Sequence, residues 1–184
     1  MAENFDPITG LDGADNMGGY KDYVLWIPKY AVSAIPTLPK KTALTTDDDL
    51  VTAAGAFVFK DAVAGKPIFF ECTPASVKFD TPAQGEVEGQ SFAPAGEFFR
   101  AGNKKAYAAF ARKYNNTPGY LIVEDMDGNQ MIVGQRNLEC YLKPSFEGGQ
   151  KRADRRGYKV TFAADSVAPV AFLGTPIDVD ALID

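Results

Sequence analysis

The sequence contains no histidine among its 184 residues, and it has only two cysteines and one tryptophan. Histidine is the commonest general base and metal ligand near neutral pH, so its absence argues against zinc sites and against nucleophiles that need an imidazole partner. Apolar runs are short, and none approaches the ~18 residues of a membrane span. The opening stretch MAENFDPITGLDG lacks the basic start and apolar core of a secretory signal. We therefore expect a protein without cofactor or metal, made in a cytoplasm and outside any membrane.

Basic residues are fewer than acidic ones, with 19 Lys and Arg against 24 Asp and Glu and a formal net charge of −5. An acidic surface repels phosphate, so binding of nucleic acid by a general basic face is not expected. The two cysteines, Cys72 in FFEC and Cys140 in ECYL, sit in apolar or aromatic runs. Such positions favour buried, reduced thiols, with a disulfide as the alternative. The length suits one domain, which we assign to residues 20–184, after an arm of residues 1–19.

Short apolar runs separated by Gly, Pro and Asp occur at the spacing of an all-β sandwich or barrel. In YKDYVLWIP, apolar side chains fall on both faces, including the only tryptophan, Trp26, as in a strand covered on two sides. LECYLKPSF is a further strand that we expect to end at Pro144. In RGYKVTFAADS, Tyr158, Val160 and Phe162 alternate with polar residues and are expected to face inward. Other strand-like runs are 56–60, 67–73, 76–79 and 96–100.

The segment YLIVEDMDGNQMIVG, residues 120–134, predicts two antiparallel strands joined by a tight turn at Asp127 and Gly128. The alternating acids Asp125 and Asp127 leave a calcium loop as the alternative. A helix-flanked calcium loop, however, ends in a bidentate Glu, which is missing here. The residues therefore favour the plain turn.

One helix is predicted in NKKAYAAFARKYNN, where Tyr107, Phe110 and Tyr114 follow helical spacing. We expect Asn103 to cap its start, and Asn115 with the residues after it to end it. The aromatic stripe is then the face that closes one end of the β core. After the last strand, VAPVAFLGTPIDVDALID is expected to pack as an extension on its own domain or on a neighbouring subunit.

The loop EGGQKRADRRG concentrates positive charge in an otherwise acidic chain. It can be a solvated hairpin tip, or a contact loop that meets acidic patches on an identical neighbour. The acidic run in the 37–49 loop is a candidate for such a patch. The candidate subunit-contact residues are therefore Lys151, Arg152, Asp154, Arg155 and Arg156 in the basic loop and Asp47, Asp48 and Asp49 in the acidic run.

Catalysis by acid pairs is the first rival hypothesis, since glycoside hydrolysis uses two carboxylates about 5–10 Å apart in a cleft. The candidates are Glu86 with Glu88, and the run 47–49. Both sets lie in loop-like sequence with no aromatic platform beside them. TTDDDL is typical of a helix cap or a solvated turn. The sequence therefore favours a protein that is not an enzyme.

The order of features from about residue 98 onward is distinctive: a short helix, a hairpin around DGN, a strand into a proline, the basic loop GGQKRADRRG, and then GYKVTFAADS. This order, with the opening strand YKDYVLWIPKYAVSAIP, resembles the tail tube proteins of long-tailed bacteriophages and the wider group that includes the type VI secretion tube protein. The resemblance implies an antiparallel β-sandwich or small barrel with one flanking helix.

The same resemblance implies a structural subunit that forms stacked, hexameric rings in a virion tail assembled in the bacterial cytoplasm. Its partners would be copies of itself and other tail proteins, and DNA would pass through without specific binding. A net acidic charge agrees with a conduit that must not hold phosphate. The alternative is another virion module on a β-sandwich, such as a capsid decoration, fibre or tail-end ring protein.

Overall fold

The computed structural model describes residues 17–40, 46–61 and 65–183, so most of the predicted arm 1–19 and part of the 37–49 loop lie outside the described residues. The helices are α1 (Lys105–Tyr114) and α2 (Asp180–Ile183), with 3-10 turns at Lys29–Ala31 and Asp48–Leu50. The strands are β1 (Tyr20–Pro28), β2 (Val32–Ala34), β3 (Thr52–Ala53), β4 (Val58–Phe59), β5 (Ile68–Glu71), β6 (Lys78–Asp80), β7 (Ala83–Gln84), β8 (Ser91–Phe92), β9 (Ala95–Ala101), β10 (Pro118–Asp125), β11 (Gln130–Val133), β12 (Cys140–Glu147), β13 (Gly157–Ala163) and β14 (Phe172–Leu173).

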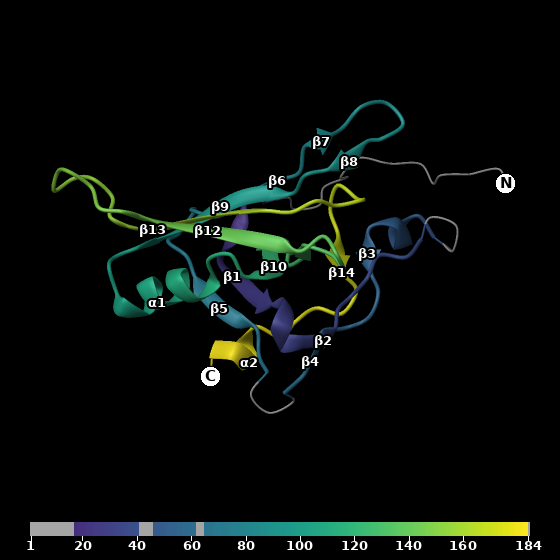
Figure 1. The fold of residues 1–184 in the computed structure, drawn as a ribbon, viewed down its shortest axis with the longest axis horizontal. Coiled ribbons are helices and arrows are strands. Elements are labelled where there is room, and N and C mark those ends of the chain that lie inside the picture. Colours follow the sequence, from purple (N-terminus) through teal and green to yellow (C-terminus); the bar gives the residue numbers. More distant parts are fainter. Residues whose placement is uncertain (1–16, 41–45, 62–64, 184) are drawn as a thin grey trace.

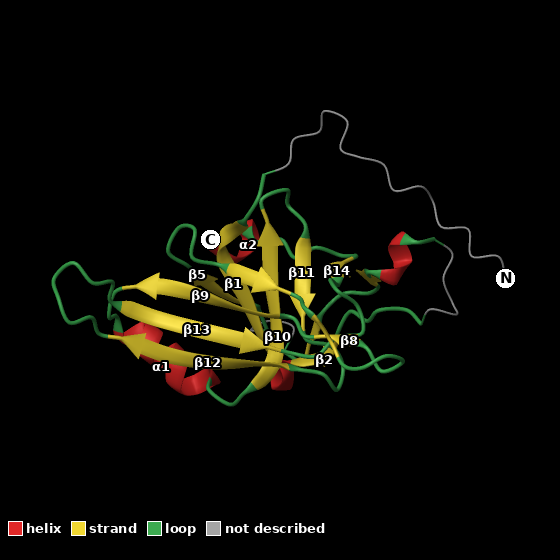
Figure 2. Ribbon diagram, turned by 90° about the horizontal axis from the view of Figure 1, so that it is seen from above, coloured by secondary structure: helices red, strands yellow, loops and turns green. Residues whose placement is uncertain are grey.

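The mainly β fold predicted from the sequence is confirmed, and its central feature is one ten-stranded sheet that curls on itself (Figures 1 and 2). We call β5, β1, β10, β11, β14 and β3 the β1 layer, and β12, β13, β9 and β6 the β13 layer. The layers join where Pro118 and Gly119 of β10 pair with Tyr141 and Cys140 of β12. Two further pairs of short strands, β2 with β4 and β7 with β8, lie outside this sheet.

Strand β1 lies between two hydrophobic clusters, as its unbroken apolar run predicts. Val24 and Trp26 pack in the cluster between the two layers, together with Phe98 and Phe162 of the β13 layer. Leu25 and the other alternate residues of β1 pack in a second cluster on the opposite face of the β1 layer. Successive side chains of a strand point to opposite faces, so one strand serves both clusters.

The predicted hairpin is formed by β10 and β11, which pair antiparallel. Gly128 adopts a φ of +90° in the turn, a conformation that glycine reaches without steric cost. The Asp125 carboxylate accepts hydrogen bonds from the Asn129 backbone N–H at 2.7 Å and from its side-chain amide at 2.9 Å. Asp125 therefore acts as a turn-forming residue.

Helix α1 carries its aromatic stripe against the core, as predicted. Phe110 lies 4.8 Å from the Phe70 ring and 4.9 Å from the Tyr114 ring, measured between ring centroids. Tyr114 is buried and meets Trp26 edge-on at 6.4 Å. The stripe thus closes the cluster between the two layers on the side of β5.

The predicted cap at Asn103 is wrong. The helix begins at Lys105, so Lys104 occupies the N-cap position, with an extended backbone and no side-chain cap bond. Asn103 lies one residue too early, and its amide oxygen instead accepts a hydrogen bond from the Tyr158 hydroxyl at 3.4 Å. The end of the helix agrees with the prediction, because the backbone leaves the helical conformation at Asn115.

The prediction that strand β12 ends at Pro144 is wrong, because the strand continues to Glu147. Pro144 stays paired in register with Val160 of β13. Beyond Leu142, which is bridged to Asn115, β12 has only β13 as a strand partner among the described residues, so its other edge is open there. A proline is tolerated on such an edge, where the missing N–H removes no ladder bond.

The C-terminal segment packs on its own fold. Phe172 of β14 pairs with Met131 of β11, and Leu173, Ile177 and Leu182 join the second cluster. The two cysteines are free and buried, which agrees with the expectation of reduced thiols.

Candidate assembly surface

The two faces of the β13 layer differ: one packs against the core, and the other carries charged side chains together with Phe99 and Tyr141. Cross-strand partners in a sheet point to the same side, so the register places Lys143, Thr161, Glu97 and Lys78 in one row across the layer. The alternate row, with Leu142 and Phe162, points into the core. We call the side that carries the charged row the outer face.

The outer face balances its charges. Besides the row above, it carries Asp80, Glu147 and Lys159, so the strands contribute three basic and three acidic residues. Lys159 Nζ lies 2.6 Å from a Glu97 carboxylate oxygen, and Lys78 Nζ lies 3.0 Å from one of Asp80. Pairs of this kind leave little net potential over the face, although each exposed pair stabilises the fold by only about 0–1 kcal/mol.

The two edges of the β13 layer differ in how far they are covered. At one edge, β12 is bridged to Asn115 at Leu142, but residues 143–147 have no strand partner on that side in the described part of the chain. At the other edge is β6, whose Phe79 carbonyl accepts a hydrogen bond from the Tyr20 hydroxyl at 3.0 Å. Unpaired edges are templates for pairing with another chain.

The predicted basic loop forms the tip of the β12–β13 hairpin, which projects from one end of the molecule (Figure 1). Two of its candidate residues hold the loop itself. The Asp154 carboxylate accepts hydrogen bonds from the backbone N–H groups of Gln150 and Lys151, both at 2.8 Å, and these bonds lower the pKa of Asp154. Arg155 pairs with Glu147 at 2.9 Å and lies over the Phe99 ring at 4.6 Å.

The side chains of Lys151, Arg152 and Arg156 are exposed at this tip and are the basic residues presented outward. The acidic candidates lie elsewhere: Asp48 and Asp49 belong to the 3-10 turn just before β3, with Asp47 preceding it. Figure 1 places this turn toward the opposite end of the long axis from the hairpin tip. The structure therefore does not bring the two predicted sets together within one chain.

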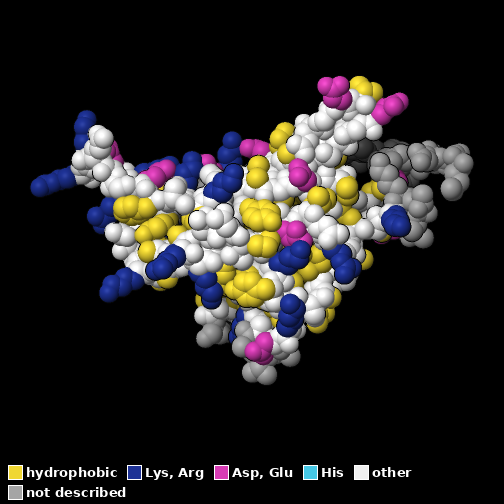
Figure 3. Space-filling model, in the orientation of Figure 1, with side chains coloured by type: hydrophobic (Ala, Val, Ile, Leu, Met, Phe, Trp, Pro, Cys, Tyr) yellow, Lys and Arg dark blue, Asp and Glu magenta, His cyan; other side chains and the backbone are white. Residues whose placement is uncertain are grey.

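The other acid pair, Glu86 and Glu88, lies on the projecting β7–β8 loop and is exposed. Figure 3 shows basic side chains at the tip of the long hairpin and acidic side chains at the tip of this second projection. Opposite charges thus mark two separate projections of the molecule.

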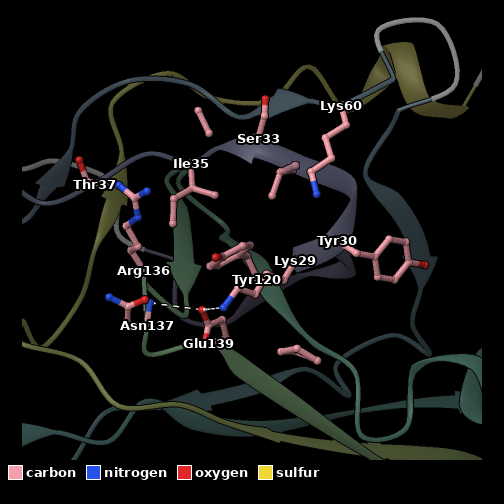
Figure 4. A pocket seen from close by; sticks show the side chains of 13 residues that line it. Lys29, Tyr30, Ser33, Ile35, Thr37, Lys60, Tyr120, Arg136, Asn137 and Glu139 are labelled. Carbon is pink, nitrogen blue, oxygen red and sulfur yellow. Dashed lines mark hydrogen bonds and ion pairs between the residues drawn. The ribbon is translucent and has the colours of Figure 1, made fainter.

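Sequence reasoning missed a groove that residues distant in the chain form together. It lies beside the end of β1 and is lined by Lys29, Tyr30, Val32, Ser33, Ala34, Ile35, Thr37, Lys60, Pro118, Tyr120, Arg136, Asn137 and Glu139 (Figure 4). Its basic residues lie far apart in sequence and belong to no motif. From the sequence alone, each could be recognised only as a residue near the end of a predicted strand.

Within the described residues, no three carboxylate or thiol side chains come together as a metal site would need. None of the helices in the described part of the chain is long and apolar enough to span a bilayer. Comparison of the chain with family models, with curated proteins and with solved structures finds no match.

Proposed function

We propose that this chain is a self-assembling structural subunit of a bacteriophage tail tube, which forms stacked and hexameric rings around a conduit for DNA. The observation that carries the proposal is the β13 layer, with a packed inner face, a charge-balanced outer face and an open edge at residues 143–147 of β12. The order of sequence features that resembles tail tube proteins supports the same reading.

The open edge of the β13 layer supports a ring. If β12 of one subunit pairs with the β6 side of the next, the contact is head-to-tail between two different surfaces. A heterologous contact closes into a ring when its rotation divides a full turn, and otherwise runs on as a helix. The layers of successive subunits would then form one continuous sheet around the axis.

The outer face supports a conduit. In a ring closed through these edges, one face of the layer lines the lumen, and the inner face is already occupied by the core. A lining with paired charges offers few unneutralised cations to DNA phosphates, so DNA would not be retained. The work of the protein would then be mechanical, with no catalytic step.

The charged projections support stacking. A basic hairpin tip on one ring can meet acidic segments on the next, and such complementarity steers and orients association. The residues suited to this contact are Lys151, Arg152 and Arg156, since Asp154 and Arg155 are engaged within the loop.

The direct test is electron microscopy and light scattering of the purified chain over a wide concentration range. We expect rings or tubes, and their formation should fall with salt because exposed charges are screened. A chain that stays monomeric at every concentration would refute the proposal.

The variant K151E/R152E/R156E tests the stacking contact. We expect it to fold normally and to form fewer or shorter tubes than the control K66E/K105E/R112E, which makes the same charge change at exposed sites elsewhere. Normal tubes from the first variant would remove the loop from the mechanism while leaving the tube itself in place.

A further inference from the structure

The groove beside the end of β1 is wide, open and basic. It has a volume of about 1110 Å³ and is walled by the segment after β1, by Lys60 beyond β4 and by the 135–139 loop. Its lining includes three basic residues, Lys29, Lys60 and Arg136, and one acidic residue, Glu139. This excess of positive charge stands out in a chain whose formal net charge is −5.

The single acid is neutralised within the groove. Lys29 Nζ lies 2.5 Å from a Glu139 carboxylate oxygen, and this hydrogen bond lowers the pKa of Glu139. Two cations then remain for an incoming group: Lys60, whose side chain is directed into the groove, and Arg136 on the opposite wall (Figure 4). The groove is therefore suited to an acidic ligand.

The groove also offers apolar surface. The Ala34 and Ile35 side chains line it, and the Tyr30 side chain at its rim is 57% exposed. A ligand that combines acidic and apolar side chains in an extended chain would use both kinds of surface. A small inorganic anion would use only the cations.

We propose that this groove receives the N-terminal segment, residues 1–16, of a second copy of this chain. The segment MAENFDPITGLDGADN has four acidic residues and no basic one, and its larger apolar residues lie between the acids. The acids are Glu3, Asp6, Asp12 and Asp15, and the apolar residues are Phe5, Ile8 and Leu11. Its chemistry complements the groove in charge and in apolar contact. The inference rests on the self-assembly proposed above and names one contact within it.

The groove and the point where the segment joins the fold lie at opposite ends of β1. The segment joins the fold at Tyr20, the first residue of β1, whereas the groove lies beyond Pro28, the last one. Eight strand steps of ~3.3 Å separate these ends by about 26 Å. A tail at one end of a strand and its socket at the other are what head-to-tail assembly requires.

Cross-linking between two singly substituted full-length chains tests the contact. One chain carries Asp6→Cys and the other Lys60→Cys, while Cys72 and Cys140 stay buried and unreactive. With a short bismaleimide we expect a cross-linked dimer in the mixture, at a yield well above that of either chain alone. The control replaces Lys60→Cys by Lys105→Cys on the exposed face of α1, and it should give no such product.

Charge reversal and its restoration add a readout that a structural defect would not produce. K60E/R136E in a third chain that carries Thr37→Cys, an exposed and uncharged position in the groove lining, should lower the cross-link yield to Asp6→Cys about tenfold, as expected for lost charge pairs at an interface. Adding Glu3→Lys and Asp12→Lys to the Asp6→Cys chain should restore the yield. K105E/R112E in the Thr37→Cys chain should leave it unchanged.

The outcomes separate this inference from the proposed function. Tubes without the Asp6–Lys60 cross-link would overturn the inference and leave the tube subunit standing. A further chain carries both Asp6→Cys and Lys60→Cys. If a cross-link forms within this chain while none forms between the singly substituted chains, the segment folds back on its own groove, which also overturns the inference. The cross-link in small oligomers that never become rings or tubes would uphold the groove contact and contradict the tube.

Discussion

Replacement of Gly119 by alanine should destabilise the protein, because Gly119 lies where the two layers join. It pairs with Cys140 of β12 and with Pro28 of β1. A Cβ at this position would lie 2.6 Å from the Ile27 carbonyl oxygen and 2.6 Å from Cζ2 of Trp26. Carbon atoms in contact normally stand ~3.5–4.0 Å apart, so the neighbours must move by about 1 Å.

The expected cost follows from what surrounds the site. Trp26 is fully buried, so its ring cannot move out into solvent. The other clash is with the Ile27 carbonyl oxygen, which belongs to the backbone and is held in the sheet. One added methyl in a packed core typically costs about 1–3 kcal/mol. For a chain of this size, about 2 kcal/mol corresponds to a fall in Tm of about 4–8 °C.

Trp26 provides the assay, because it is the only tryptophan and its fluorescence reports its own exposure. Urea unfolding of the Gly119→Ala chain should show a lower midpoint than the Gly89→Ala chain, where the added Cβ meets only the Glu86 carbonyl oxygen at 3.7 Å. The loss of stability caused by Gly119→Ala can also be measured by circular dichroism in a Trp26→Phe chain. It should be smaller there than in the wild-type background, because the phenylalanine ring is smaller. Equal midpoints for Gly119→Ala and Gly89→Ala would refute the packing argument.

Three further predictions follow from individual side chains. Asp125→Ala should cost about 1 kcal/mol in urea unfolding through its lost hydrogen bonds, and millimolar Ca²⁺ should leave the wild-type midpoint unchanged; a clear calcium-induced rise would restore the metal hypothesis. Burial raises the pKa of the Cys72 thiol to about 12 and that of Cys140 likewise upward, so neither should react with a thiol reagent at pH 8 before unfolding, and rapid labelling of the folded protein would contradict this. The pKa of Asp154 is held below its ordinary 3.8 by hydrogen bonds from backbone N–H groups, so its support of the loop is complete above that pH and lost as pH falls through the lower folded pKa; hydrogen exchange of amides 150–151 that does not change at low pH would contradict this.

Local features of the fold were predictable from the sequence because they depend on residues close together in the chain. The two apolar faces of β1, the turn at Gly128 and the aromatic stripe of α1 each follow from spacing within about ten residues. The inward alternation of Tyr158, Val160 and Phe162 is of the same kind, and these three side chains are buried.

The errors arose where a distant partner decides the outcome. Pro144 ends a strand only if its missing N–H would face a partner, and the open edge of β12 could not be inferred from neighbouring residues. The groove was invisible for the same reason, since Lys29, Lys60 and Arg136 meet only after the sheet has formed. The basic loop was predicted from the sequence. The hydrogen bonds that Asp154 accepts within the loop and the ion pair of Arg155 with Glu147 depend on the folded shape of the loop and could not be predicted.

The pairing of β1 has a consequence during synthesis on the ribosome. Tyr20 pairs with Asp125, so the chief partner strand leaves the ribosome about 100 residues after β1, roughly 5–20 s later at usual elongation rates. Strand β5 arrives sooner but covers only one edge of β1. During this interval the apolar residues 24–27 lack β10, the strand that pairs with them in the folded protein. The yield of native protein should therefore depend on elongation speed and on chaperones as much as on the final stability of the sheet.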